Sequence, residues 1–291
     1  MPGDPLVDVP EVRGYGILSP LGTGAGSVIY KAVSRQSGEP VAIKWVPRRR
    51  RADDRYIRQV ENEWQVCSRL SHPNVVGVRE LVHCRDLFWL RGCALVMEYV
   101  DGRPLATLED LPLTSLLEYF IQTASALEHI HQQGYAHYDL KPHNILVRRS
   151  GLSVKLVDFG IAAPLGSKRE RVQGTVSFIA PEQTEPGTVD RRTDIFNLGA
   201  TMYRMLTSHS LPTTFFSTPG TSPQPEQLLW ASITKINPAV PKPLADLVLD
   251  CTRRPIQERP ASAAEVMRRL EAVRTGLPPA PPAAAGGEGT R

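Results

Sequence analysis

The sequence has few cysteines and no long apolar run, and both absences narrow the classes of protein that it can encode. The four cysteines, at positions 67, 84, 93 and 251, form no CxxC motif and no metal-ligand spacing, so we expect reduced thiols, as is usual in the cytosol. No apolar stretch approaches the roughly 18 residues that a transmembrane helix needs, and the N-terminus lacks the basic and apolar parts of a signal peptide. We expect a cytoplasmic protein without membrane contact in these residues, while a membrane tether beyond residue 291 stays open.

The excess of positive over negative charge is also small. The net charge is only +4 over 291 residues, so no strong field attracts a polyanion. The basic stretch at residues 47–55, PRRRRADDR, has no interleaved aromatics on which bases could stack. It is more typical of a solvated loop, and we expect no nucleic-acid partner. The length and the apolar content of 41% are sufficient for one large domain or for two lobes with separate cores.

Strand signals dominate the first hundred residues and helix signals the rest. Short β-branched or aromatic segments separated by Gly and Pro predict strands at residues 15–22, 27–34 and 40–46. A further strand is predicted from residue 94 and runs into a loop at Asp101-Gly102. Helical spacing appears at residues 54–70 and later at 113–134, 194–208, 243–254 and 262–274. Short strand signals at 144–147 and 154–159 interrupt the helices. Residues 275–291 are rich in Pro, Ala and Gly and predict a disordered linker.

A glycine-rich turn and a strand lysine form the first pair of functional signals. Gly22, Gly24 and Gly26 lie between two predicted strands, where glycine lets the backbone approach a phosphate closely and offer its N–H groups. Glycines at such a position can equally mark an ordinary turn. Lys44 lies within the apolar strand VAIKWV, where its ammonium group either extends to solvent or is a paired cation in a cleft.

The helix predicted over residues 54–70 offers a partner for that lysine. At about 100° per residue, Glu63 falls inside the arc of apolar positions that faces the core, whereas Glu61 falls outside it. A carboxylate that faces the core needs a cation, because burying it unpaired is costly. Lys44 is the candidate partner, although Glu63 could also lie at the edge of a half-exposed face.

Residues 136–147, AHYDLKPHNILV, include one Asp, one Lys and one Asn close to the start of a predicted strand. Turns favour Asp and Asn, which leaves Lys141 unexplained. Asp158 follows within LVDFG, and its carboxylate and the amide oxygen of Asn144 are ligands that Mg²⁺ prefers. Asp139 is then the remaining carboxylate, free to position and deprotonate a hydroxyl group.

The order and spacing of these motifs resemble the protein kinase family. The resemblance runs from about residue 13 to 272 and rests on Gly22-x-Gly24, Lys44, Glu63, HYDLKPHN, DFG and the APE at residues 180–182. It implies a bilobal α+β fold, with a small antiparallel β lobe that carries one helix and a larger, mainly helical lobe. The implied boundaries are an N-terminal extension at 1–11, the small lobe at 12–97, a hinge at 98–102, the large lobe at 103–274 and the linker at 275–291.

The resemblance also implies ATP as cofactor together with Mg²⁺, with Mn²⁺ as an alternative metal. Lys44, paired with Glu63, would bind the α- and β-phosphates, Asp139 would be the catalytic base and Lys141 would steady the transferring phosphoryl group. Asn144 and Asp158 would bind the metal. The residues implied to contact ATP are Gly22, Thr23, Gly24, Ala25, Gly26, Ser27, Ile29, Ala42, Lys44, Met97, Glu98, Val100, Asn144 and Asp158.

Further residues resemble the serine/threonine branch of the family, which acts on protein substrates. A lysine two residues after Asp139 and the segment GTVSFIAPE with Thr175 are typical of that branch. The resemblance pairs Glu182 with Arg259 and makes Asp194 a brace for the catalytic loop. Arginines outnumber lysines 27 to 7, and this bias together with the Pro- and Ala-rich tail is similar to bacterial members and suggests a role in bacterial signalling.

Three positions depart from the pattern of the family. Tyr138 stands where an arginine commonly receives a phosphate from the activation segment, and residues 161–173 of that segment contain one hydroxyl, at Ser167. We therefore predict activity that does not depend on an activation-segment phosphate. Ser27 replaces the third glycine of the loop, and Gly26 stands where a large aromatic is common, so the loop would cover the phosphates less tightly.

Two other functions remain as alternatives. A pseudokinase would use the same fold as a nucleotide-binding interaction module, and a small-molecule phosphotransferase would use a related fold on a metabolite. Lys44, Glu63, Asp139, Asn144 and Asp158 are all present, which favours an active enzyme, and the GTVSFIAPE segment favours a peptide substrate. A regulatory partner stays open.

Overall fold

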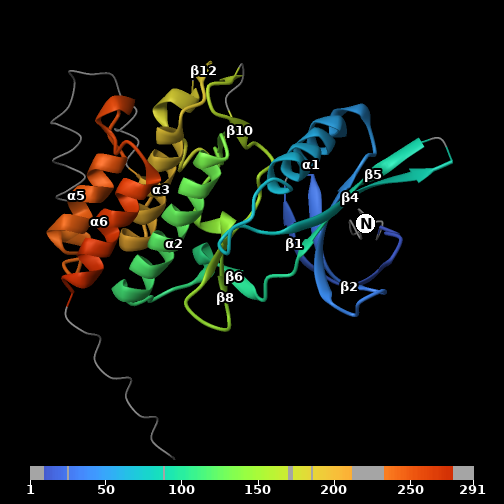
Figure 1. Ribbon diagram of the computed structural model, residues 1–291, viewed down its shortest axis with the longest axis horizontal. Coiled ribbons are helices and arrows are strands. Elements are labelled where there is room, and N and C mark those ends of the chain that lie inside the picture. Colours follow the sequence, from blue (N-terminus) through green and yellow to red (C-terminus); the bar gives the residue numbers. More distant parts are fainter. Residues whose placement is uncertain are drawn as a thin grey trace, which may run out of the picture.

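The computed structural model describes residues 10–24, 26–87, 89–169, 173–184, 186–211 and 233–277. They form a β lobe with one covering helix and a second lobe built mainly of helices (Figure 1). This is the bilobal α+β fold that the sequence predicts. Ala25 and most of the predicted terminal extension and linker lie outside the described residues.

The β lobe is a five-stranded antiparallel sheet with the strand order β1-β2-β3-β5-β4. Successive side chains of a strand point to opposite faces, so Val41, Ile43 and Trp45 enter one apolar cluster while Ala42 and Val46 enter another. Lys44 therefore shares the face of Ala42 and Val46. The strands are β1 Tyr15–Gly24, β2 Ser27–Ser34, β3 Pro40–Pro47, β4 Val78–Asp86 and β5 Trp89–Glu98.

Helix α1, Asp54–Cys67, packs on that face and buries Ile57, Val60, Val66 and Cys67. It ends three residues before the predicted boundary at Leu70. The amides of Arg69 and Leu70 donate to carbonyls three residues back, which tightens and closes the last turn.

Strand β4 was missed by the sequence analysis. Its register runs from Val78 to Asp86 along β5, at the edge of the sheet. Most of its side chains are exposed or half-buried, and several are charged, as is usual on an edge strand. An edge strand of this kind lacks the apolar alternation by which a strand is recognised.

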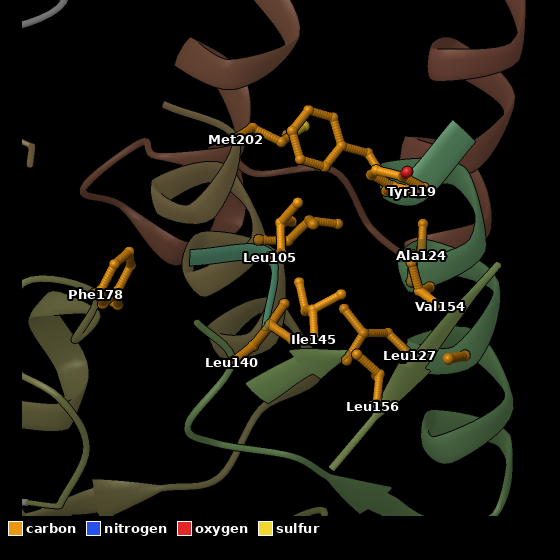
Figure 2. Packing of buried hydrophobic residues seen from close by; sticks show 14 of the residues in the cluster. Leu105, Tyr119, Ala124, Leu127, Leu140, Ile145, Val154, Leu156, Phe178 and Met202 are labelled. Carbon is orange, nitrogen blue, oxygen red and sulfur yellow. The ribbon is translucent and has the colours of Figure 1, made fainter. Parts of the chain in front are cut away.

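The helical lobe is built around α2, which contacts both α3 and α6. Figure 2 shows Leu127 of α2 in the cluster with Ile145 and Leu156, which belong to two short strands. The elements are β6 Gly102–Pro104, α2 Leu113–Gln132, β7 Tyr135–Ala136, β8 Ile145–Arg148, β9 Val154–Leu156, β10 Ala163–Pro164, β11 Lys168–Arg169, β12 Gly187–Thr188, α3 Arg191–Thr207, α5 Lys242–Cys251 and α6 Ala263–Thr275. No helix within the described ranges is long and apolar enough to cross a membrane.

Strands β6, β8 and β9 form a small sheet that positions the polar residues on either side of it. β8 begins directly after Asn144, and β9 ends two residues before Asp158. The strand predicted over 154–159 is thus shorter than expected. Asp158 has φ +67°, a left-handed conformation that a strand cannot continue through.

Candidate active site

Lys44 lies between two carboxylates at the junction of the lobes. Its Nζ is 2.7 Å from Glu63 Oε2 and 2.8 Å from Asp158 Oδ1. Glu63 is buried on α1 and also accepts a hydrogen bond from the amide of Phe159. The predicted pair of Lys44 and Glu63 is confirmed, and Asp158 joins it across 114 positions of sequence.

The electrostatics of this group follow from one cation shared by two carboxylates. Burial opposes the charged form of Lys44, but the Coulomb attraction of Glu63 and Asp158 outweighs it and raises the pKa of the ammonium group. Burial raises the pKa of Glu63 despite Lys44, whereas Lys44 outweighs burial at Asp158 and lowers the pKa of that carboxyl. Asp158, the more exposed carboxylate, is therefore the more readily ionised of the two.

Asp194, in the first turn of α3, holds the loop before Asp139. Its carboxylate accepts hydrogen bonds from the amides of His137 at 2.8 Å and Tyr138 at 2.7 Å, and it lies 2.8 Å from His131 Nε2. Burial alone would raise its pKa, but His131 and the other hydrogen bonds lower it. Tyr138 has φ +70°, a strained conformation for a residue with a side chain. The two amide contacts hold it there.

Asp139, Lys141 and Thr175 form a closed set of polar contacts. The Thr175 hydroxyl donates to Asp139 Oδ1 at 2.9 Å and accepts from Lys141 Nζ at 2.7 Å, and the same Nζ is 2.7 Å from Asp139 Oδ2. Asp139 can therefore accept a hydrogen bond from an aliphatic hydroxyl while a cation lies beside the same oxygen atoms.

Asn144 and Asp158 offer the donor set of a hard divalent cation. Asn144 Nδ2 donates to the carbonyl oxygen of Asp139 at 2.9 Å, which leaves Oδ1 of the amide as the atom that can bind metal. Asp158 has one oxygen on Lys44 and a side chain that is 44% exposed. An amide oxygen and a carboxylate fit Mg²⁺, which keeps several waters and takes few protein ligands.

The hairpin of β1 and β2 holds the glycines of the first motif. Gly22 and Thr23 pair with residues of β2, and Gly24 lies opposite Ser27. Ile29 lies opposite Lys44 on β3. A Cβ added to Gly26 would lie 2.4 Å from the ring of Tyr56 of α1. An aromatic side chain from the helix therefore occupies the space next to Gly26, where the family commonly carries a large aromatic in the loop itself.

Known protein kinases are similar to this chain over most of its length. A family model described as "Protein kinase domain" matches residues 15–269. The chain belongs to the protein kinase family. Serine/threonine-protein kinase PrkC of Bacillus subtilis is 32% identical over 82% of this chain and 37% of that protein. Serine/threonine-protein kinase PkaA of Streptomyces coelicolor is 31% identical over 90% of this chain and 50% of that protein.

A third relative is the probable serine/threonine-protein kinase PknB of Lactococcus lactis, 30% identical over 87% of this chain and 41% of that protein. The kinase chain described here thus spans half or less of the length of these relatives. Members of the protein kinase family use ATP and a divalent metal ion and act on proteins.

The other predicted ATP-contacting residues lie on β3, on β5 and in the hinge. Ala42 and Met97 are cross-strand partners and are both buried, as is Val100. The Glu98 side chain is held by other parts of the protein, because its oxygens contact Arg148 Nη2 at 2.9 Å, Lys155 Nζ at 2.9 Å and the amide of Gly77 at 3.1 Å. Of Glu98, only the main chain is left for a nucleotide.

The activation segment packs against Tyr138. The Tyr138 ring lies in an apolar cluster with Ala136, Ala163 and Val189, and the guanidinium of Arg169 lies 5.1 Å from the ring centroid. Arg169 also contacts the carbonyl of Ile161. An apolar cluster and a cation–π contact thus stand where the family commonly has an arginine.

Glu182 and Arg259 form the predicted ion pair within the helical lobe. The two guanidinium nitrogens of Arg259 lie 2.6 and 2.8 Å from the two carboxylate oxygens of Glu182, and the arginine side chain is fully buried. This two-pronged geometry fixes the APE segment to the loop before α6.

Sequence analysis missed several residues that complete the kinase site. Asn62 donates from α1 to the carbonyls of Phe159, Gly160 and Ala162, and His131 contacts Asp194. A polar Asn in a half-buried helix was an available signal. Cys93 also lies beside Glu61 and His83 in the folded chain. Their spacing in sequence carries no signal.

Proposed function

We propose that this chain is the catalytic domain of an ATP-dependent protein serine/threonine kinase. The observation that carries the proposal is the contact set of Asp139, Lys141 and Thr175, in which the proposed base already accepts a hydrogen bond from a threonine hydroxyl. Three relatives that bear the name serine/threonine kinase support it. The domain boundaries at 12–97, 98–102 and 103–274 belong to the same proposal.

In the reaction, the substrate hydroxyl takes the position beside Asp139. Its oxygen bonds to the γ-phosphorus of ATP while the bond to the oxygen bridging the β- and γ-phosphorus atoms breaks. The hydroxyl proton passes to Asp139, and ADP leaves. Lys141 neutralises charge on the transferring group, and Lys44 binds the α- and β-phosphates, so catalysis rests on positioning and charge.

Nucleotide binding is assigned to the hairpin, the hinge and the metal ligands. Asn144 and Asp158 would hold Mg²⁺, which supplies charge neutralisation at the phosphates. The protein contacts of ATP are proposed to come from Gly22, Thr23, Gly24, Gly26, Ser27, Ile29, Ala42, Lys44, Met97, Val100 and the main chain of Glu98. Ala25 completes the predicted loop outside the described residues. We place the protein in the cytoplasm in a bacterial signalling role, with protein substrates and no nucleic-acid partner.

The test is transfer from Mg-ATP to generic protein substrates, with phosphate located by mass spectrometry. Phosphoserine or phosphothreonine is expected with the parent chain. Asp139→Asn, which keeps size and polarity but cannot accept the proton as a base, should lower the rate by at least about 100-fold. ATP binding without any transfer, measured by calorimetry, would contradict the proposal and indicate a nucleotide-binding module.

Activity of the kinase is proposed to be independent of a phosphate on the activation segment. Tyr138 carries no positive charge to receive one, and its ring instead packs with Ala163, Val189 and Arg169. The Ser167 hydroxyl is already used locally, because it donates to the carbonyl of Pro164 at 2.6 Å. The described part of the segment thus packs through apolar contacts and a cation–π contact.

Ser167→Ala should therefore retain transfer activity within about twofold, because it removes no charge-assisted contact. Tyr138→Ala should lower the activity several-fold, since it opens the apolar cluster that supports the segment. The measurement is the rate of phosphorylation of a protein substrate by enzyme treated with a phosphatase. The proposal would be contradicted if Ser167→Ala lost its activity and if the phosphatase-treated parent chain regained activity when Ser167 was phosphorylated.

A further inference from the structure

Three side chains with metal-binding chemistry, none of which the catalytic scheme uses, meet on the β lobe. One ligand atom each of Glu61, His83 and Cys93 lies within 4.8 Å of the other two. His83 Nε2 is 2.9 Å from Glu61 Oε1. They come from α1, β4 and β5, which lie side by side in Figure 1.

The backbone brings these residues together for simple geometric reasons. His83 and Cys93 are direct cross-strand partners on β4 and β5, and residues opposite each other in an antiparallel pair project from the same face. Cys93 belongs to the apolar cluster that includes Val60 of α1, so this face is the one that α1 covers. Glu61 follows Val60 on the helix and supplies the third ligand atom.

The donor set selects a class of cation. A thiolate, an imidazole and a carboxylate together suit a borderline-soft ion such as Zn²⁺, whereas Mg²⁺ and Ca²⁺ prefer oxygen ligands alone. We propose that Glu61, His83 and Cys93 form a Zn²⁺ site that joins α1 to the edge of the sheet. An ion placed among them lies within about 3 Å of each atom, so small side-chain rotations reach the usual bond lengths of about 2.0–2.3 Å.

The partial exposure of His83 and Glu61 provides an entry path for the ion. Cys93 is fully buried and forms the inner wall, while the side chains of His83 and Glu61 are 38% and 35% exposed. On binding, the Cys93 thiol releases its proton to solvent and its sulfur bonds to the metal. His83 binds through the lone pair of Nε2 in place of its contact with Glu61, and water completes the tetrahedral set. No oxidation or reduction takes place.

The expected consequence is a restraint on helix α1. Glu61 lies two residues before Glu63, which pairs with Lys44. A metal bond from Glu61 to two strands would hold that part of the helix against the sheet. This inference does not depend on the proposed kinase activity, because the binding and the restraint are measured without substrate or nucleotide.

The test is titration of the chelator-treated full chain with Co²⁺ alone and with Zn²⁺ alone, without nucleotide. We expect one tight ion per chain and a thiolate-to-cobalt charge-transfer band, which oxygen ligands such as Asp158 and Asn144 cannot produce. Zn²⁺ should displace the cobalt, raise Tm and slow hydrogen exchange in residues 54–67. Cys93→Ser should abolish the band, while Cys84→Ser, a neighbouring cysteine whose side chain belongs to the opposite face, should retain it.

His83→Asn and Glu61→Gln, at the half-exposed positions, should each weaken Zn²⁺ binding by at least about tenfold. They also decide the outcome if Cys93→Ser fails to fold. Unchanged Zn²⁺ affinity in both variants would overturn the proposal and leave an ordinary ion pair beside a core cysteine. A charge-transfer band that persists in Cys93→Ser, or disappears in Cys84→Ser, would overturn it as well.

Discussion

Asp194 accepts hydrogen bonds from two main-chain amides just before Asp139 and contacts His131, although its side chain is fully buried. Such a carboxylate is stable only while all its partners are in place. Sequence comparison with the family predicted the brace, but not that a histidine of α2 is part of it. At the scale of single residues, the backbone just before the proposed base is held by this one side chain.

Asp194→Asn should lower the free energy of unfolding by about 3 kcal/mol at neutral pH, because its amide group meets donors that need an anion. The carboxyl has its pKa lowered below the ordinary value of 3.8. The stabilisation that it supplies is therefore present above that value and is lost as the pH falls through the lowered pKa. Urea unfolding at several pH values checks this. If the free energy of unfolding fell equally at low pH in the parent chain and in Asp194→Asn, the prediction would be contradicted.

The hairpin of β1 and β2 and the helix α1 meet at Gly26 and Tyr56. Gly26 has φ +78°, and a Cβ there would come within 2.4 Å of the Tyr56 ring. Glycine at this position is thus required twice, by the backbone conformation and by the close approach of the ring. The element that would cover the phosphates is thereby coupled to the helix that carries Glu63.

Gly26→Ala should lower the free energy of unfolding by about 1–3 kcal/mol, since it adds strain and an overlap with the ring. Gly22→Ala is the matched control, because a Cβ at Gly22 meets nothing within 4 Å. When Tyr56→Ala is added to Gly26→Ala, the part of the lost free energy of unfolding that is due to the overlap with the ring should be recovered. Chemical unfolding measures each value, and equal losses in the two single variants would exclude the contact with Tyr56 as the cause.

Across the whole molecule, Glu98 connects the two lobes of the fold. It accepts from the Gly77 amide in the β lobe and from Arg148 and Lys155 on the small sheet of the helical lobe. Lys155 is nearly buried and also donates to the carbonyl of Val75. The hinge is therefore held by an ionic network as well as by the chain itself.

Glu98→Gln should lower the free energy of unfolding by about 2 kcal/mol, because it leaves the nearly buried Lys155 without its anion. Hydrogen exchange at residues 98–102 should become faster. Glu118→Gln is the control, since Glu118 pairs with the half-exposed Arg274 within one lobe, and it should cost less than about 1 kcal/mol. Unchanged exchange at the hinge in Glu98→Gln would show that the network does not restrain the lobes.

Prediction from the sequence succeeded where residues close in sequence decide the secondary structure. Helix α2 and the strands β2 and β3 lie close to their predicted ranges because their periodicity or β-branched content is strong. It failed at β4, an exposed edge strand, and at the end of the strand before Asp158. In both places, pairing with distant residues or a left-handed backbone decides the structure.

The sequence by itself determined the family, the two-lobe fold and the pairing of Lys44 with Glu63, because the order and spacing of motifs and the helical phase are local properties. Only the tertiary structure decided that Tyr56 fills the space at Gly26, that His131 contacts Asp194 and that Glu61, His83 and Cys93 converge. Such contacts depend on strand register and on how a helix lies across a sheet. Both are set by the packing of the whole core and leave no trace in the spacing of the residues involved.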